Sequence, residues 1–238
     1  MLKQALKGKN ALITGATGGL GTAIAKELAQ CGCNLFLTGR NDVKLQSLRS
    51  ELGSNDINVF SKVTDLADKK EVKSLIETAE ETFPVDILIN NAGCFPIKSI
   101  LESEDKDYEN CFSINVQAPF FLSRDFGKNM CERGWGRIVN IGSSSAYNGS
   151  EKTGLYCASK HALLGLSRSL YLEYKQYGVR VYNVSPGSVQ TEMGRTDFRQ
   201  DFSTFVKPEE VAEYLAFIIG FDAEGISEEI RFNRITVR

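Results

Sequence analysis

Short runs of apolar residues alternate along the chain with longer stretches in which apolar residues recur every three or four positions. The short runs are rich in β-branched residues and have the length of strands, whereas the longer stretches have the period of amphipathic helices. Six strands are predicted in this way, at residues 11–14, 35–38, 59–63, 87–89, 138–141 and 179–184. Helices are predicted between them, at residues 20–31, 69–82, about 107–132 and about 155–177, together with one that carries Leu45, Leu48 and Leu52.

Strands of continuous apolar residues, each followed by a helix, are typical of a parallel sheet that is buried on both faces. The pattern therefore predicts an α/β fold with a doubly wound parallel sheet of Rossmann type. The length of 238 residues fits a single domain, 1–238, because doubly wound sheets reach this size as single units. Residues 230–237 alternate in polarity and are predicted to form a last strand.

Two residues predict local breaks in the helices. Pro119 lies inside the stretch 107–132, and because proline lacks an N–H group it should bend that helix near Asn115. Gly178 follows the stretch 155–177, at the position where a C-cap glycine would end the helix.

Charge and composition narrow the class of protein. The formal net charge is −2, with 28 Lys and Arg against 30 Asp and Glu, so no basic surface for nucleic acid or an anionic membrane is expected. No apolar run approaches the roughly 18 residues of a membrane span, and residues 1–10 lack the core of a signal peptide. We therefore expect a cytoplasmic protein with no nucleic-acid and no membrane partner.

The six cysteines are spread along the chain, and the only histidine is His161. No Cys-x-x-Cys pair occurs, so no metal site is expected. In a chain without a secretory signal we expect the cysteines to be reduced and mostly buried.

A glycine-rich segment, Thr14-Gly15-Ala16-Thr17-Gly18-Gly19-Leu20-Gly21, joins the first predicted strand to the first helix. Glycines let the backbone turn sharply and approach a ligand, and the N-terminus of the following helix offers free N–H groups to a phosphate. The segment is therefore a candidate dinucleotide-binding turn. Its spacing is Gly-x3-Gly-x-Gly, and a purely structural turn remains the alternative.

Single polar residues follow the next two strands. Arg40 stands after the second strand, where dinucleotide folds meet the adenosine ribose and an arginine accommodates a 2′-phosphate. Asp65 follows the third strand and would accept a hydrogen bond from the adenine amino group. A plain surface arginine and an ordinary residue at a helix N-terminus are the alternatives.

Polar and glycine-rich segments also end the fourth, fifth and sixth strands. They are Asn90-Asn91-Ala92-Gly93, Gly142-Ser143-Ser144-Ser145 and Ser185-Pro186-Gly187. Any tight turn uses the same residue types. Ligands of open α/β sheets bind at the carboxyl ends of the strands, so we expect these segments to face one crevice.

Tyr156 and Lys160 stand four residues apart in the predicted helix at 155–177, so they share one helix face. A positive charge beside a phenol favours the phenolate, so Lys160 should lower the pKa of Tyr156 and make the pair an acid/base unit. Ser143 would add a hydroxyl that donates to a substrate oxygen. Taken alone, such a pair is usually an exposed packing pair on a helix surface.

Together these motifs resemble the short-chain dehydrogenase/reductase family over about residues 8–220. The matching segments are, in order, Thr14 to Gly21, Asn90 to Gly93, Asn115, Ser143, Tyr156-x-x-x-Lys160 and Pro186-Gly187. The resemblance implies that Tyr156 exchanges a proton with the substrate oxygen and that Ser143 orients this oxygen. It also implies that Lys160 assists Tyr156 and holds the nicotinamide ribose, while Asn115 holds a water that links Lys160 to solvent.

The resemblance implies a nicotinamide cofactor, because no side chain can supply a hydride. The residues that would bind it are Gly15, Thr17, Gly18, Gly19, Leu20, Gly21, Arg40, Asp65, Leu66, Asn91, Ala92, Gly93, Tyr156, Lys160, Pro186, Gly187, Val189 and Thr191. Arg40 favours NADP (NADPH) over NAD. His161 would be a helix residue beside the site and not a catalyst.

The expected function is an NADP(H)-dependent interconversion of a ketone and a secondary alcohol, as in a 3-oxoacyl reductase-like member. The segment of about 190–207 would cover the small-molecule carbonyl or alcohol substrate. Its apolar residues, which line the substrate or pack within the loop itself, are Met193, Phe198, Phe202 and Phe205. A non-catalytic NADP-binding sensor or scaffold of the same fold is the alternative.

Two features depart from the family pattern. The C-terminal segment 225–238 lacks the usual glycine-rich ending, which puts the subunit contact made there in doubt. Tyr177 and Gly134 occupy the positions at which some members have arginines that contact acyl carrier protein, although Arg133 is adjacent to the second position.

The family implies a homodimer or homotetramer through the helices at 107–132 and 155–177. The apolar residues expected at this interface are Phe112, Val116, Phe120, Leu122, Phe126, Leu163, Leu166, Leu170 and Tyr174. A monomer in which the sheet covers these residues is the alternative.

Overall fold

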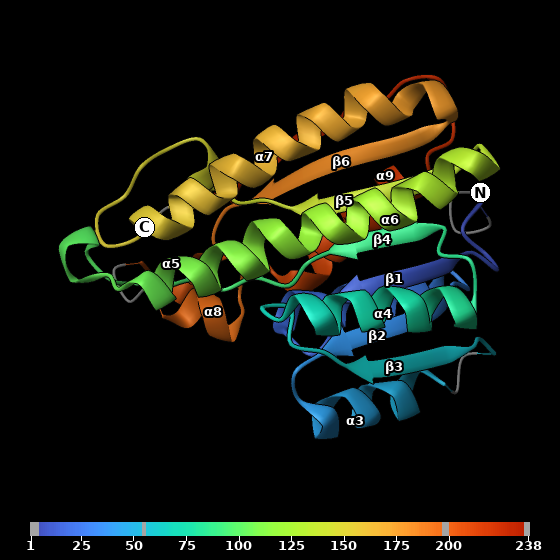
Figure 1. Ribbon diagram of the computed structural model, residues 1–238, viewed down its shortest axis with the longest axis horizontal. Coiled ribbons are helices and arrows are strands. Elements are labelled where there is room, and N and C mark those ends of the chain that lie inside the picture. The colour runs from blue at the N-terminus through green and yellow to red at the C-terminus, as the bar shows by residue number, and fades with distance from the viewer. Residues whose placement is uncertain (1–4, 54–55, 197–199, 236–238) are drawn as a thin grey trace.

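The computed structural model describes residues 5–53, 56–196 and 200–235, and its strands form one sheet (Figure 1). The strands are β1 (Asn10–Thr14), β2 (Asn34–Gly39), β3 (Val59–Val63), β4 (Ile87–Asn90), β5 (Gly136–Ile141), β6 (Val179–Pro186) and β7 (Glu229–Phe232). Their order is β3-β2-β1-β4-β5-β6-β7, and every neighbouring pair is parallel. The strand order reverses between β1 and β4, which is the point where such sheets open a crevice.

The helices cover both faces of this sheet. They are α2 (Gly19–Gln30), α3 (Asp42–Leu52), α4 (Lys69–Thr82), α5 (Asp105–Phe112), α6 (Ala118–Arg133), α7 (Gly154–Tyr174), α8 (Glu192–Arg195) and α9 (Pro208–Gly220). Shorter helical turns are η1 (Ile100–Glu102), η2 (Ser113–Gln117), η3 (Ser144–Ala146), η4 (Lys175–Tyr177) and η5 (Phe202–Thr204). α4, α6 and α7 lie in front of the sheet in Figure 1, and α2, α3 and α9 contribute to the core on the opposite face.

The central strands β1 and β4 are apolar at successive positions because successive residues point to opposite faces and both faces are buried there. In β1, Ile13 belongs to the core beneath α2 and α9, whereas its neighbour Leu12 belongs to the core beneath α4 and α6. In β4, Ile87 and Ile89 join the first core and Leu88 joins the second. The predicted doubly wound fold is thus confirmed, together with the first six predicted strands, which are β1 to β6.

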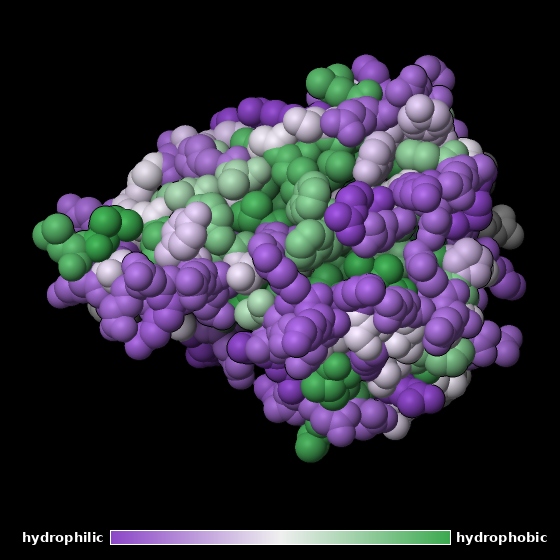
Figure 2. Space-filling view, in the orientation of Figure 1, coloured by the Kyte–Doolittle hydropathy of each residue, from purple (hydrophilic) through white to green (hydrophobic). Residues whose placement is uncertain are grey.

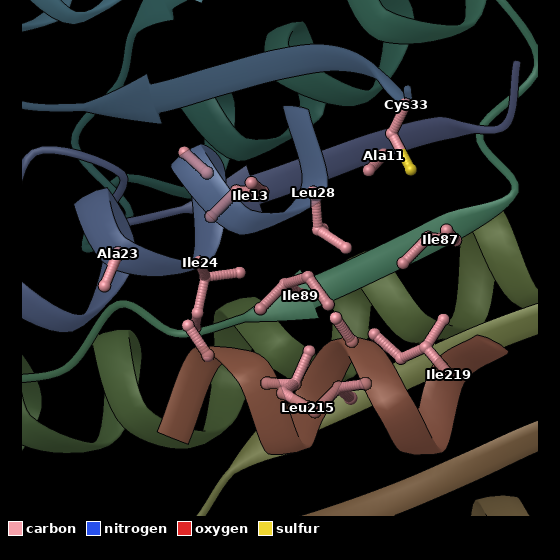
Figure 3. Close-up of a cluster of buried hydrophobic side chains, with 14 of the residues drawn as sticks. Ala11, Ile13, Ala23, Ile24, Leu28, Cys33, Ile87, Ile89, Leu215 and Ile219 are labelled. Carbon is pink, nitrogen blue, oxygen red and sulfur yellow. The ribbon is translucent and has the colours of Figure 1, made fainter. Parts of the chain in front are cut away.

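α9 lies beside α2 against the same face of the sheet (Figure 3). Leu28 of α2 and Leu215 and Ile219 of α9 are buried in one cluster with Ile89. The sequence analysis missed α9, although Pro208 in the first turn is a signal that begins helices.

The helical stretch predicted at 107–132 is interrupted, as Pro119 suggested. α5 ends at Phe112, a π-helical turn spans residues 113–117, and α6 begins with Pro119 in its first turn. Asn115 lies in this π turn. Gly178, with φ +74°, ends the helical segment after η4, which confirms the expected C-cap.

The last strand is shorter than predicted. β7 covers Glu229–Phe232, whereas the expected strand ran from 230 to 237. It ends where β6 ends, because Phe232 pairs with Pro186, the last residue of β6. Residues 236–238 lie outside the described part of the chain.

Several side chains expected at a subunit interface are instead buried within the monomer. Leu122, Phe126, Leu163 and Leu170 are at most 7% exposed, so the expectation that they face a partner is wrong. Phe120 remains 42% exposed. Apolar atoms still gather along α6 and α7 on the surface in Figure 2.

The cysteines are free, as expected, and four of the six are buried. In the part of the chain that the structure describes, no helix combines the length and the apolar character needed to cross a membrane.

We expect Leu215→Ala to lower the free energy of unfolding by about 2–5 kcal/mol, because it removes a fully buried side chain where α9 meets α2. The matched control is Leu101→Ala, at a side chain that is 99% exposed. This control should change the free energy by less than about 0.5 kcal/mol. Urea unfolding measures both, and equal losses would contradict the packing of α9 in the core.

Candidate active site

Close approaches bring the segments that follow β1, β4 and β6 to one crevice. Gly15, after β1, lies so near the segment after β4 that a Cβ on it would meet Ala92 Cα at 2.8 Å. Gly19, at the start of α2, lies so near the segment after β6 that a Cβ would meet Thr191 Cγ2 at 2.9 Å. The segments after β1, β4 and β6 therefore lie against one another at the carboxyl edge of the sheet, which is the opening of the candidate site.

The turn after β1 needs glycine at defined positions. Gly15 has φ +62°, and a Cβ on Gly21 would collide with the carbonyl oxygen of Gly15. Gly18 is the N-cap of α2, yet no side chain caps this helix and its first turn holds no acidic residue. The positive end of the helix is therefore available to an anion. Leu20 is buried, so its side chain serves the core and only its backbone reaches the opening.

Asn91 and Thr14 tie the ends of β1 and β4 together. Asn91 Nδ2 donates to the carbonyl oxygens of Thr14 and Gly15 at 2.9 and 3.1 Å. In return, Thr14 Oγ1 accepts from the N–H groups of Asn91 and Ala92, both at 3.0 Å. The side chain of Asn91, expected to bind a cofactor, therefore holds the glycine turn in place.

Arg40 and Asp65 flank the other end of the opening. Arg40 is exposed directly after β2, and Gly39 before it lies against the turn, since a Cβ there would meet Thr17 Oγ1 at 3.0 Å. Asp65 uses one carboxylate oxygen to accept from Ala67 N at 3.0 Å. Leu66 is only 8% exposed and packs in the core.

Ser143, Tyr156 and Lys160 meet at the end of β5. Ser143 follows β5 and is the N-cap of η3, where its Oγ accepts from Ser145 N at 3.1 Å. Tyr156 and Lys160 lie one turn apart on α7, and the hydroxyl of Tyr156 is hydrogen-bonded to Ser143. Lys160 Nζ donates to the carbonyl oxygen of Ile141 at 2.7 Å. All three predicted side chains are less than 10% exposed.

Burial sets the charge state of this group. It raises the pKa of Tyr156 to about 12, against a hydrogen bond from Ser143 that lowers it. Burial also lowers the pKa of Lys160 to about 8. The predicted lowering of the Tyr156 pKa is therefore wrong for this structure, because the ammonium group binds the Ile141 carbonyl and lies 5.7 Å from the centre of the phenol ring.

Asn115 braces the segment after β4 against α7. Its Oδ1 accepts from Cys94 N at 2.9 Å, and its Nδ2 donates to Cys94 O at 3.0 Å and to Ser159 Oγ at 2.9 Å. A Cβ on Gly93 would lie 3.3 Å from Asn115 Oδ1 and 3.8 Å from Lys160 Nζ. Asn115 and Lys160 therefore both lie next to Gly93, as expected of neighbours. The Asn115 side chain itself links the backbone of Cys94 to Ser159 of α7.

The segment after β6 closes the opening. Pro186 is buried and ends β6, Gly187 N donates to Phe232 O at 2.9 Å, and Val189 forms a bridge with Val206. Thr191 caps α8 by accepting from Gly194 N at 3.0 Å.

The apolar side chains of the expected substrate loop have different environments. Phe205 is 4% exposed and its ring lies 5.2 Å from that of Phe202, which favours packing of the loop within itself. Met193 is 41% exposed. Phe198 lies outside the described residues.

Sequence reasoning missed Phe95. Its ring stands edge-on to Tyr156 with the centroids 4.6 Å apart, so it forms an aromatic wall beside the phenol. The signal was its position, two residues after the Asn90-Asn91-Ala92-Gly93 segment. His161 is exposed on α7, and its Nδ1 contacts Cys157 O at 2.8 Å.

Comparison with known proteins agrees with this geometry. The family model for short chain dehydrogenase matches residues 9–201. The chain is 36% identical over 233 residues to a 3-oxoacyl-(acyl-carrier-protein) reductase of Rickettsia conorii, and the match covers 93% of each chain.

Solved structures give the same result. The structure of an alcohol dehydrogenase from the archaeon Thermococcus sibiricus, complexed with 5-hydroxy-NADP, has a TM-score of 0.89 at 26% identity, covering 98% of this chain and 99% of that chain. An actinorhodin polyketide ketoreductase with NADPH has a TM-score of 0.86 at 30% identity, covering 95% of both chains.

The buried Lys160 predicts how stability depends on pH. Folded Lys160 loses its proton above about pH 8, whereas the unfolded lysine keeps it up to its ordinary pKa of 10.5. The unfolded state therefore binds more protons in this window, and the free energy of unfolding of the wild type should rise with pH relative to that of Lys160→Met. The rise is at most about 3 kcal/mol.

Urea unfolding of both proteins at several pH values between about 8 and 10.5 measures this difference. Lys44→Met, at an exposed lysine of α3, is the matched control and should follow the wild type. A constant difference between the wild type and Lys160→Met would contradict the lowered pKa.

Proposed function

The chain belongs to the short chain dehydrogenase family of oxidoreductases, and on that premise we propose that it interconverts a ketone and a secondary alcohol with NADP(H). The observation that carries the proposal is the buried group of Ser143, Tyr156 and Lys160 at the end of β5. A hydroxyl, a phenol and an ammonium group in one enclosure are the groups that a carbonyl reduction needs.

Tyr156 is the proposed acid. A pKa of about 12 keeps the phenol protonated at neutral pH, so it can donate to the carbonyl oxygen as charge develops there. Ser143 Oγ accepts from Ser145 N, so it acts as the donor toward Tyr156, and we propose that its proton turns to the substrate oxygen when that oxygen binds. In the reverse direction Tyr156 accepts the alcohol proton.

Lys160 stabilises the phenolate that proton transfer leaves behind. Its ammonium group lies 5.7 Å from the Tyr156 ring centre and donates to Ile141 O, so the proposed role requires it to turn from Ile141 toward the phenolate as the proton leaves. When bound, the dinucleotide supplies the hydride to the carbonyl carbon or accepts it from the alcohol.

The chain's residues fit such a dinucleotide. The uncapped N-terminus of α2 suits a pyrophosphate. Gly19 has no side chain between Thr191 and the start of α2, so a ligand there could approach the backbone N–H groups closely. Exposed Arg40 suits a 2′-phosphate. Structural relatives bound to 5-hydroxy-NADP and NADPH support the same preference.

We propose a 3-oxoacyl thioester as the substrate class. The names of two relatives, a 3-oxoacyl reductase and a polyketide ketoreductase, support this choice. Gly134 has φ +71°, a backbone conformation that favours glycine, and its carbonyl oxygen lies where a Cβ on Gly178 would stand. The backbone conformation therefore accounts for the glycine at position 134. Because Tyr177 and Gly134 replace the carrier-contacting arginines, we favour a small thioester over one held on a carrier protein.

The alternative is an NADP-binding sensor or scaffold without turnover. The buried Lys160 argues against it, because an enclosed ammonium group is costly and binding alone needs no acid/base group. Wild-type protein that binds NADPH but oxidises none with 3-oxoacyl thioesters, diketones, quinones or steroids would favour the alternative.

Tyr156→Phe should lower kcat with an acetoacetyl thioester by about 10²–10⁴-fold, because it removes only the acidic proton. NADPH binding should change little. Tyr171→Phe, a partly buried tyrosine on the same helix α7, is the control and should keep the wild-type rate. NADPH oxidation measures turnover, and retention of more than about a tenth of kcat in Tyr156→Phe would refute the assignment.

Arg40→Asp should invert the preference for NADPH over NADH. A guanidinium group paired with a 2′-phosphate contributes about 1.5–3 kcal/mol, or one to two decades in kcat/KM. Lys44→Asp places the same charge change on the neighbouring exposed lysine and should leave the preference intact. A wild-type protein that uses NADH better than NADPH would contradict the role of Arg40.

We propose a homodimer or homotetramer that buries the face of α5, α6 and α7. Tyr108, Phe120 and Leu172 are 51%, 42% and 60% exposed there, and exposed apolar patches mark interfaces. Light scattering should give a multiple of 26.3 kDa, and Phe120→Asp should shift the population toward monomer. Leu101→Asp, at an exposed leucine outside this face, should not, and a wild-type mass of one chain would exclude the interface.

A further inference from the structure

Two cysteines beside the candidate active site have no role in the proposed reaction. Cys94 belongs to the segment after β4, and Cys111 lies on α5 one turn before Asn115. Asn115 binds both: its amide pairs with the backbone of Cys94 at 2.9 and 3.0 Å, and its Nδ2 donates to Cys111 Sγ at 3.5 Å. Cys94 Sγ lies 4.0 Å from the carbonyl oxygen of Asn110, the residue before Cys111, so the two cysteines are neighbours.

The surroundings favour one thiolate in this pair. The hydrogen bond from Cys94 lowers the pKa of Cys111 to about 7, although burial raises it. Lys160 lowers it further through its charge, and Asn115 does so as a hydrogen-bond donor to Cys111 Sγ. The same contact raises the pKa of Cys94. As the pH rises through neutrality, Cys111 therefore loses its proton while Cys94 keeps its own.

The pair also has access to small reagents. Cys94 is only partly buried, whereas Cys111 is buried behind it. Other cysteines lack this combination: Cys33 is buried with a pKa raised to about 12, and burial raises the pKa of Cys131. Thiolate character and access together select the cysteines that react.

We propose that Cys94 and Cys111 are a reversible dithiol/disulfide couple that reacts with a low-molecular-weight disulfide such as oxidised glutathione. Cys94 Sγ attacks one sulfur of the reagent while its proton passes to the Cys111 thiolate, and one glutathione thiolate leaves. The Cys111 thiol then gives its proton to that thiolate and attacks Cys94 Sγ, which expels the second glutathione thiolate. Two protein thiols are oxidised and one disulfide is reduced to two thiols.

The disulfide changes the neighbours of Lys160. The negative charge on the pair raises the pKa of Lys160 against the effect of burial, and oxidation removes that charge. Lys160 then loses its proton more readily, and Asn115 loses a thiolate acceptor. We therefore expect the oxidised protein to lose turnover, a consequence that rests on the proposed function, whereas disulfide formation does not.

The first experiment treats the purified full chain with oxidised glutathione and maps its peptides by mass spectrometry. The expected product is a peptide pair linked through Cys94 and Cys111, and dithiothreitol removes the link. Cys131→Ser, at a partly buried cysteine of α6, should form the link to the wild-type extent. Glutathione retained on Cys94 or Cys111 without a link, or no reaction at either, would overturn the proposal.

The second experiment measures NADPH oxidation before and after the same treatment. The wild type should lose at least about tenfold in rate and recover it with dithiothreitol, whereas Cys94→Ser and Cys111→Ser should keep the rate that each has before treatment. A linked protein with an unchanged rate would overturn the effect on the site. Peptide mapping gives its answer even if the reduced protein shows no turnover, so failure of the couple and failure of the proposed function are distinguishable.

Discussion

The reciprocal hydrogen bonds between Thr14 and Asn91 are the constraint on which the rest of the site depends. They join the ends of β1 and β4 at the point where the strand order reverses. The side chain of Asn91 binds the backbone at the end of β1, and the side chain of Thr14 binds the backbone that follows β4. The glycine turn that follows β1 and the segment that leads to Cys94 therefore keep a fixed separation. A second amide, Asn115, extends this rigid frame from β4 to α7. Binding and chemistry are thus positioned by two asparagines that need not touch a substrate.

Enclosure has opposite effects on the two ionisable groups of the site. It keeps Tyr156 protonated and draws the proton from Lys160, so both groups favour their neutral forms. Nearby carbonyl and thiol groups oppose this on the lysine, since Ile141 O accepts from Nζ and the cysteine pair raises the lysine pKa. The pKa of Lys160 is therefore set by burial, which lowers it, and by these neighbours, which raise it. A change in the neighbours changes the fraction of Lys160 that is charged.

Much of the fold could be predicted because both faces of the sheet are apolar, and strands of this kind are recognisable without knowledge of their partners. The break at Asn115 was also predictable, since Pro119 cannot donate a backbone hydrogen bond. The groups that each side chain contacts could not be predicted from the sequence. Asn91 faces backbone rather than ligand, and the phenol of Tyr156 is governed by burial, which depends on the packed fold. The contact of Phe95 with Tyr156 can be recognised only when the segment after β4 and α7 are placed together.

Arg231 of β7 and Arg234 after it contact segments that belong to the candidate site region. Arg234 donates to Thr204 Oγ1 at 2.9 Å and also to Gln200, and Arg231 lies 3.5 Å over the ring of Tyr147. The loop over the crevice and the residues after β7 therefore share contacts, whereas β1 begins at the opposite edge of the sheet (Figure 1). This asymmetry matters for protein production. An affinity tag fused at the carboxyl end follows closely in sequence on the arginines that make these contacts and belongs on a cleavable linker, whereas one at the amino end precedes a strand that makes none of them.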